Sequence, residues 1–155
     1  MKSVAPPLVP DREDLRPGYR TELGSYTLSS DEIVAFASQW DPQFFHVDED
    51  RAANEGYFGG LIASGVQTLA VYQRLTVDCL LQHWDVIGGA GIHDLQFLRP
   101  VRPGDTLTGF TVIEDVQSQP VRGRMRVVST GELINQKRKQ VLVLTMSVYL
   151  RMRGL

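Results

Sequence analysis

The chain is poor in cysteine and contains no long apolar run. Cys79 is the only cysteine among the 155 residues, so an intramolecular disulfide is excluded. No group of Cys and His residues has the spacing of a metal site. A single thiol is typical of a protein from the reducing cytoplasm, and we expect a cytoplasmic location.

Two further absences concern membranes and nucleic acids. No stretch approaches the roughly 18 to 20 consecutive apolar residues of a membrane span, and residues 1–10 lack the apolar region of a signal peptide. The 16 basic and 18 acidic residues include no basic block, whereas a nucleic-acid surface needs a concentrated positive footprint. We therefore expect a soluble protein with no membrane and no nucleic-acid partner.

The one local cluster of positive charge consists of Arg122, Arg124 and Arg126. Alternate residues of a strand point to the same face, so these arginines would share one side of a strand. We interpret that side as solvated; contact with an anionic ligand is the alternative.

The length of the chain fits one domain with a sizeable core. Residues 1–16 contain three prolines and the charged run 11–14, a composition that favours an extended N-terminal arm. We expect a single domain over residues 17–155.

The first half of that domain mixes one strand with helices. Residues 19–28 place Leu and Tyr among Thr and Ser, which predicts a strand. Ser29 and Glu32 have the spacing of a capping box, and the apolar residues behind them repeat at helical spacing as far as Trp40. The proline that follows Asp41 ends this short helix.

A long helix and four strands account for the remainder. Residues 48–54 suit a helical turn, and a largely buried helix is predicted over residues 63–81. The face of this helix that we expect to be buried carries Val66, Leu69, Ala70, Gln73, Val77 and Leu80. Segments rich in Val, Thr, Leu and Phe, separated by turn formers, predict strands over 90–99, 106–116, 121–130 and 140–151. The expected fold is α+β, with a curved antiparallel sheet around one long helix.

The residues that carry chemistry lie before the long helix. Asp41 and His46 are five residues apart in an apolar, proline-bent loop, and the segment 59–65 supplies a glycine turn that enters a helix. A carboxylate and an imidazole can hold one water and move its proton. The free N–H groups of a helix N-terminus stabilise a developing oxyanion, and Gly65 is the candidate donor.

Each of these residues also has a plain structural interpretation. Asp41 could brace the turn before proline, His46 could be an ordinary buried histidine, and Gly65 could serve close helix–sheet packing. For His83 we favour a charge role near a helix C-terminus, and for His93 a structural role on its strand.

Three segments resemble the MaoC-like, (R)-specific enoyl-CoA hydratases. Residues 41–46, Asp-Pro-Gln-Phe-Phe-His, resemble the Asp-x-Asn-Pro-x-His element of that family; residues 59–65 resemble the entry to its central helix, and residues 98–105 resemble a strand-turn element. The resemblance implies a hot-dog fold and reversible syn addition of water to a trans-2-enoyl-CoA thioester. It further implies Asp41 as base, His46 as the partner that activates water, and Gly65 as the oxyanion donor. No cofactor or metal is required beyond the coenzyme A of the substrate, and a homodimer or larger homo-oligomer is expected.

The resemblance also suggests contacts with substrate. We expect Phe45 and Ser64 at the substrate site. Arg99 and Arg102 are candidates for binding the coenzyme A phosphates, because the Arg fork suits phosphate, and the equal alternative is that they are surface charges flanking a turn. The aromatic residues around Asp41, including Trp40, are expected to raise its pKa.

The sequence departs from the family pattern at several positions. Gln43 and Phe44 replace the family's Asn and Pro, and Ser64 replaces a common histidine. The position at which some hydratases bind the aspartate through a serine falls near Ala70, and we do not transfer that role to Ser64. Two alternatives stay open: a hot-dog acyl-CoA thioesterase and a non-catalytic acyl-binding domain.

Overall fold

The computed structural model describes residues 15–152, so the predicted N-terminal arm lies almost wholly outside the described residues. None of the described helices is long and apolar enough to cross a membrane. The elements, in chain order, are β1 (Arg20–Thr27), α1 (Ser30–Trp40), α2 (Phe44–Val47), α3 (Glu49–Glu55), α4 (Gly65–Cys79), the 3-10 turn η1 (Leu81–His83), β2 (Val86–Phe97), β3 (Thr106–Gln119), the 3-10 turn η2 (Pro120–Arg122), β4 (Arg124–Ile134) and β5 (Gln140–Arg151).

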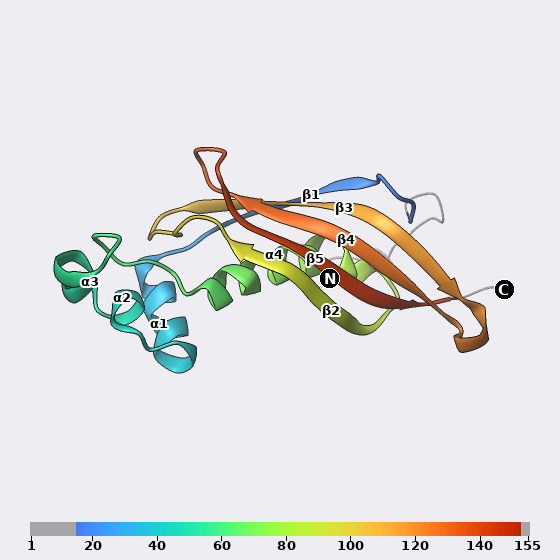
Figure 1. Cartoon of the computed structure of the whole chain (residues 1–155), viewed down its shortest axis with the longest axis horizontal. Coiled ribbons are helices and arrows are strands. Elements are labelled where there is room, and N and C mark those ends of the chain that lie inside the picture. Colours follow the sequence, from blue (N-terminus) through green and yellow to red (C-terminus); the bar gives the residue numbers. More distant parts are fainter. Residues whose placement is uncertain (1–14, 153–155) are drawn as a thin grey trace, which may run out of the picture.

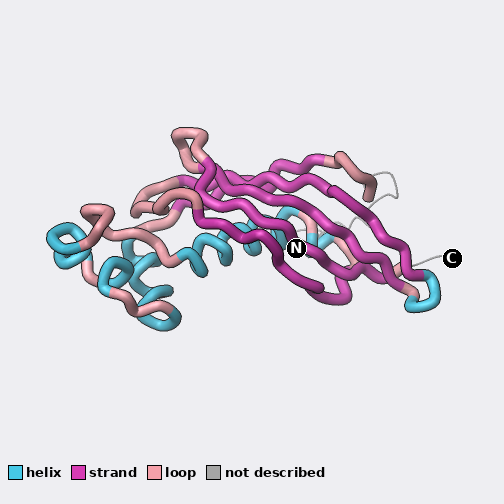
Figure 2. Tube along the Cα trace, viewed as in Figure 1, coloured by secondary structure: helices cyan, strands magenta, loops and turns pink. Residues whose placement is uncertain are grey.

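The strands form one antiparallel sheet in the order β1-β3-β4-β5-β2. The sheet curves over α4, while α1, α2 and α3 gather at one end of the molecule (Figure 1). The tube view shows the same two layers, with the helices on one face of the sheet (Figure 2). The expected α+β fold, a long helix against a curved antiparallel sheet, is confirmed.

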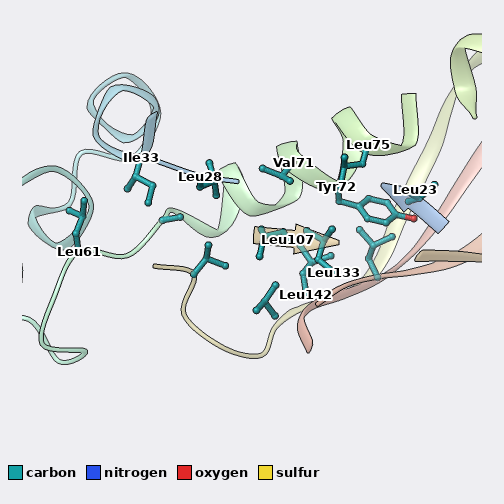
Figure 3. Packing of buried hydrophobic residues seen from close by; sticks show 14 residues of the cluster. Leu23, Leu28, Ile33, Leu61, Val71, Tyr72, Leu75, Leu107, Leu133 and Leu142 are labelled. Atoms are coloured by element: carbon teal, nitrogen blue, oxygen red, sulfur yellow. The ribbon is translucent and has the colours of Figure 1, made fainter. Parts of the chain in front are cut away.

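The core fills the space between α4 and the concave face of the sheet. Val71, Tyr72 and Leu75 of α4 pack toward Leu107 and Leu133 of the strands (Figure 3). All five side chains are buried. This packing fixes α4, and therefore its N-terminus, relative to the sheet.

The buried face of α4 differs from the predicted one. The buried residues are Gln67, Thr68, Val71, Tyr72, Leu75 and Thr76, whereas Val66 is 56% exposed and Ala70 is exposed. Most of their polar atoms are hydrogen-bonded: Thr76 Oγ1 donates to the Tyr72 carbonyl at 2.8 Å, and Gln67 Nε2 to the Glu32 carbonyl at 3.2 Å. Gln67 Oε1 is the exception, because it is buried without a hydrogen-bond partner among the described residues. Leu69 and Leu80 of the predicted set are partly buried against the core. Apolar periodicity therefore located the helix but did not identify its most deeply buried residues.

The arginine cluster is also arranged differently from the prediction. Arg122 lies in η2 and β4 begins at Arg124, because Pro120 and the left-handed Gly123 make a turn there. The Arg124 guanidinium lies over the Tyr149 ring, 3.9 Å from its centroid, and Arg126 Nη2 donates to Ser147 Oγ at 3.1 Å. The three arginines do not form one solvated strand face.

Candidate active site

The end of α1 positions Asp41. Its backbone N–H donates to the Ala37 carbonyl at 2.8 Å, which completes the last helical turn. Asp41 itself leaves helical geometry with φ −154° and ψ 68°, because a residue before proline avoids the helical region. The carboxylate is thereby held at a fixed helix exit.

Three side chains contact the two oxygens of this carboxylate. Ser64 Oγ donates to Oδ2 at 2.7 Å, and Gln43 Nε2 donates to Oδ1 at 2.8 Å. His46 Nε2 lies 3.3 Å from Oδ2. Asp41 and His46, predicted as a pair, are thus brought together, and two donors orient the carboxylate.

His46 is buried and its ring orientation is fixed. It lies in the short helix α2, is 4% exposed, and its Nδ1 is 2.7 Å from the Ile62 carbonyl oxygen. The Ile62 backbone N–H in turn donates to the Phe45 carbonyl at 3.1 Å, which ties α2 to the segment before α4. Because a carbonyl oxygen only accepts, Nδ1 carries a proton, and Nε2 is the ring nitrogen that faces Asp41.

Asp41 and His46 together can bind one water molecule when the His46 ring is neutral. In that state the carboxylate Oδ2 and the imidazole Nε2 can each accept a hydrogen bond. Water has the two O–H groups that this arrangement requires, so the pair can orient a water molecule through both of its hydrogens.

The pKa of Asp41 moves in the direction opposite to the prediction. Burial raises it, but hydrogen bonds from Ser64 and Gln43, together with the charge interaction with His46, outweigh that effect and lower the pKa below its ordinary value. The apolar enclosure expected from Trp40 is absent, because that side chain is 67% exposed. The carboxylate is therefore held in its ionised form.

Ser64 has a role that sequence reasoning declined to give it. It is fully buried, and its hydroxyl donates a hydrogen bond to Asp41. The same hydroxyl caps α4 by accepting from the Val66 backbone N–H at 3.3 Å. One side chain thus joins the start of α4 to the carboxylate.

Gly65 is the first residue of α4, where a backbone N–H has no partner within the helix. A Cβ at this position would lie 2.6 Å from Cε2 of Phe97, so the aromatic ring of Phe97 packs directly against Gly65. This close packing explains why a glycine is needed, and it is compatible with a free N–H. The sequence contained no signal for the contribution of Phe97.

A pocket of about 260 Å³ opens beside these groups, and His46, Gly65 and Phe97 all line it. Arg99 also lines this pocket, and its Nη1 donates to the Gln140 carbonyl at 2.7 Å. Arg102 is not part of the lining; its Nη2 donates to the Phe58 carbonyl at 2.9 Å. The remaining lining residues are Phe58, Ile62, Ala63, Thr68, Leu98, Pro100, Val101 and Val141.

Other candidates lie apart from this pocket. Phe45 does not line it and instead packs edge-on against the His46 ring, with centroids 4.4 Å apart. His83 lies in η1 and His93 in β2. Residues 15–152 contain no group of three or more His, Cys, Asp and Glu side chains able to hold a metal ion.

A larger depression of about 350 Å³ lies on the opposite face of the sheet. Its lining includes Arg20, Phe110 and Glu132. Phe110 alternates along β3 with the core residue Leu107 and therefore points outward. The depression has no acid/base pair comparable to Asp41 and His46, so the smaller pocket is the candidate site.

Comparison with known proteins gives a consistent result. Residues 16–137 match the MaoC like domain family. The chain is 37% identical over 128 residues to the uncharacterized protein YdeM of Bacillus subtilis, covering 82% of this chain and 89% of that protein. A MaoC-like dehydratase from Rhodospirillum rubrum is 37% identical, with a TM-score of 0.81 and coverage of 92% of this chain and 97% of that one. The (R)-hydratase from A. caviae involved in PHA biosynthesis is 22% identical, with a TM-score of 0.74 over 89% of this chain and 98% of that chain, and shows the shared hot-dog fold.

Proposed function

Because the chain belongs to the MaoC-like domain family, we propose that it is a hydro-lyase acting on an acyl thioester of coenzyme A. The reaction is the reversible syn addition of water to a trans-2-enoyl-CoA, which gives the (R)-3-hydroxyacyl-CoA. The observation that carries this proposal is the carboxylate–imidazole pair, Asp41 Oδ2 and His46 Nε2, 3.3 Å apart beside the pocket.

The proposed chemistry assigns one role to each member of the pair. A water held between them attacks C3 of the enoyl group while Asp41 takes one of its protons, and His46 accepts a hydrogen bond from the other. The C2=C3 bond shifts its electrons to the thioester oxygen, forming an enolate. Asp41 then returns its proton to C2 on the face from which water came. A lowered carboxyl pKa makes the protonated Asp41 a strong acid for this second step.

The enolate oxygen needs a donor that does not have to reorganise. In our proposal the backbone N–H of Gly65 is this donor, aided by the partial positive charge at the N-terminus of α4. Ser64 supports the assignment, because its hydroxyl connects this helix start to Asp41. No metal or further cofactor takes part in the proposed reaction.

We also propose that the protein is a homodimer whose subunits meet along β2. This strand is an edge of the sheet, with β5 as its neighbour, and exposed edges invite pairing with another strand. Ile87, Ile92 and Phe97 on β2 are 50%, 43% and 54% exposed. Since Phe97 also lines the pocket, a second copy along this edge would help to enclose the substrate.

Light scattering after size exclusion tests this assembly. We expect the mass of a dimer for the native protein and of a monomer for Ile92→Lys, because a buried lysine without a partner is costly. A native protein with the mass of a monomer would contradict the proposed dimer. It would not bear on the proposed hydration reaction.

The proposed activity is tested by the loss of enoyl-thioester absorbance with short and medium trans-2-enoyl-CoA. Asp41→Asn and His46→Ala should each abolish hydration. Asp50→Asn on the exposed side of α3 and His83→Ala in η1 are matched controls that should keep it. Release of free thiol, assayed in parallel, would instead identify a thioesterase. Full activity in Asp41→Asn would remove the carboxylate from the mechanism.

A further inference from the structure

From the charges around the pocket mouth, we propose that the β4–β5 turn binds the 3′-phosphate of coenzyme A. The turn presents Lys137, Arg138 and Lys139 in succession. This inference rests on the proposed function, because the surface is assigned to one part of coenzyme A, the group that carries the acyl substrate. It also favours coenzyme A over a carrier protein as the source of the thioester.

The turn is adjacent to the segment that lines the pocket. Arg99, a lining residue, donates from Nη1 to the carbonyl of Gln140, the residue after Lys139. The Leu98 backbone N–H donates to the Val141 carbonyl at 2.9 Å, and both of these residues line the pocket. Figure 1 shows the β4–β5 turn at the end of the sheet where α1, α2 and α3 gather. A ligand that leaves the pocket past Arg99 therefore meets the turn.

The backbone of the turn is fixed, while its cationic side chains are exposed. Asn135 Oδ1 accepts from the backbone N–H groups of Lys137 at 3.0 Å and Lys139 at 3.1 Å. The Arg138 backbone N–H donates to the Asn135 carbonyl at 2.9 Å, and Arg138 has the left-handed φ of 58°. All three cationic residues are exposed. The turn thus offers three neighbouring positive charges without having to fold around a ligand.

A second set of bonds holds the turn against the 102–105 loop. Gln136 Nε2 donates to Asp105 Oδ1 at 2.8 Å, and Gln136 Oε1 accepts from the Thr106 backbone N–H at 3.1 Å. Arg102 belongs to this loop, and its own backbone N–H donates to Asp105 Oδ2 at 2.9 Å. These bonds hold the two segments side by side. We refer to their cationic residues together as the cationic rim: Arg99, Arg102, Lys137, Arg138 and Lys139.

The charges of this cationic rim are not neutralised within the described chain. The ion pairs among residues 15–152 join His46 with Asp41, Arg51 with Glu55, and Arg74 with Asp78; the rim takes part in none of them. The nearby carboxylate of Asp105 is bound by backbone and amide donors instead. Two of the chain's three lysines lie in this short turn. Such a concentration of unpaired positive charge beside a pocket favours a multiply charged anion.

Coenzyme A has the charge distribution that this arrangement requires. Its reactive thioester is separated by the long pantetheine arm from a pyrophosphate and a 3′-phosphate. In our proposal the acyl group occupies the pocket and Arg99, which lines it, binds the pyrophosphate. The β4–β5 turn beyond Arg99 then binds the 3′-phosphate. Lysine binds phosphate as a point charge and arginine through its planar fork.

Calorimetric titration of the full chain with free coenzyme A, 3′-dephospho-coenzyme A and pantetheine tests the proposal without needing turnover. Lys137→Gln/Lys139→Gln should weaken coenzyme A binding about tenfold, the size of one charge-assisted hydrogen bond. The affinity of the same double variant for 3′-dephospho-coenzyme A should equal that of the native protein. The control Arg122→Gln/Arg151→Gln removes two exposed charges near the opposite end of the sheet (Figure 1) and should bind all three ligands as the native protein does.

The outcomes separate this proposal from the proposed function. Equal native affinities for coenzyme A and its dephospho form, or unchanged coenzyme A binding in the turn variant, would overturn the phosphate assignment even if hydration is observed. Binding that depends on the 3′-phosphate and the turn would uphold it even if no enoyl-CoA is hydrated. A turn variant that loses affinity for a holo acyl carrier protein, but not for coenzyme A, would assign the surface to a carrier protein and overturn our inference.

Discussion

Ser64 and Asp41 are joined by a 2.7 Å hydrogen bond in which the serine hydroxyl donates to Oδ2, the carboxylate oxygen that also faces His46 Nε2. The same hydroxyl accepts from the Val66 backbone N–H at the start of α4. The orientation of the carboxylate and the position of the helix N-terminus are therefore coupled through one buried side chain. Loss of this side chain should affect both the proposed acid/base pair and the proposed oxyanion donor.

We expect Ser64→Ala to raise the pKa of Asp41, because a hydrogen bond that favours the ionised carboxylate is removed. The free energy of unfolding should fall by about 1–2 kcal/mol through the lost helix cap and carboxylate bond. Hydration of enoyl-CoA should slow about tenfold, the effect of one charge-assisted hydrogen bond. The carboxyl ¹³C shift, followed by NMR against pH, reports the pKa directly.

Ser29→Ala is the matched control for this variant. Ser29 caps α1 by accepting from the Glu32 backbone N–H at 3.1 Å, whereas the donors to the Asp41 carboxylate are Ser64 and Gln43. It should lose a similar amount of stability without any change in the Asp41 pKa or the hydration rate. Equal rate losses in the two variants would show that Ser64 acts only through helix stability.

The sequence predicted the sheet more accurately than the buried face of the helix. Strand composition and turn formers located β3 and β5 closely, because Val and Thr pack well on a pleated surface. The prediction for α4 missed its most deeply buried residues because three of them, Thr68, Thr76 and Gln67, are polar. The hydrogen bonds that allow their burial cannot be detected by apolar periodicity.

At the candidate site, the pairing of Asp41 with His46 was predictable from the sequence, whereas the hydrogen-bond partners of the Asp41 carboxylate were not. Asp41 and His46 are close in sequence and belong to one motif, so their pairing followed from the residues themselves. Ser64 lies 23 residues from Asp41, and only the tertiary fold brings its hydroxyl to the carboxylate. The lowered pKa follows from this unforeseen contact and from Gln43.

Gln43→Ala should raise the pKa of Asp41 in the same direction as Ser64→Ala, since Gln43 Nε2 donates to Oδ1 at 2.8 Å. Because Gln43 is exposed, the free energy of unfolding should stay within about 0.5 kcal/mol of native. Gln39→Ala, at an exposed position of α1, serves as the control. An unchanged NMR titration of Asp41 in Gln43→Ala would refute the proposed influence of Gln43.

The lowered pKa of Asp41 also predicts how stability varies with pH. A carboxyl whose folded-state pKa is depressed contributes stability above its unfolded pKa, and loses it as pH falls through the folded value. The stability difference between native protein and Asp41→Asn should therefore be constant above about pH 5 and shrink below about pH 4. Urea unfolding at a series of pH values measures this difference. A gap that widens toward low pH would contradict the direction of the shift.

Gly131→Ala should destabilise the fold at a point remote from the pocket. An added Cβ on β4 would lie 2.6 Å from Cε2 of the buried Tyr72 and still closer to its hydroxyl. Such overpacking typically costs about 1–3 kcal/mol, which chemical denaturation can resolve. Gly60→Ala, in the segment before α4, would meet only Arg102 Nη1 at 3.5 Å and should leave the free energy of unfolding near native. Equal stability in the two variants would mean that Tyr72 can move aside.

Gly65→Ala separates the packing role of this glycine from the proposed role of its backbone. The added Cβ would meet the Phe97 ring at 2.6–2.9 Å, and the displaced ring would obstruct the pocket that both residues line. The N–H of residue 65 is retained, and φ at this position is not in the left-handed region, so alanine fits the helix. We therefore expect Gly65→Ala to lower kcat/KM, and Gly65→Ala/Phe97→Ala to regain the value of Phe97→Ala alone. Enoyl-CoA hydration by these three variants and the native protein completes a double-mutant cycle, and a double variant no better than Gly65→Ala would show that the glycine backbone itself is required.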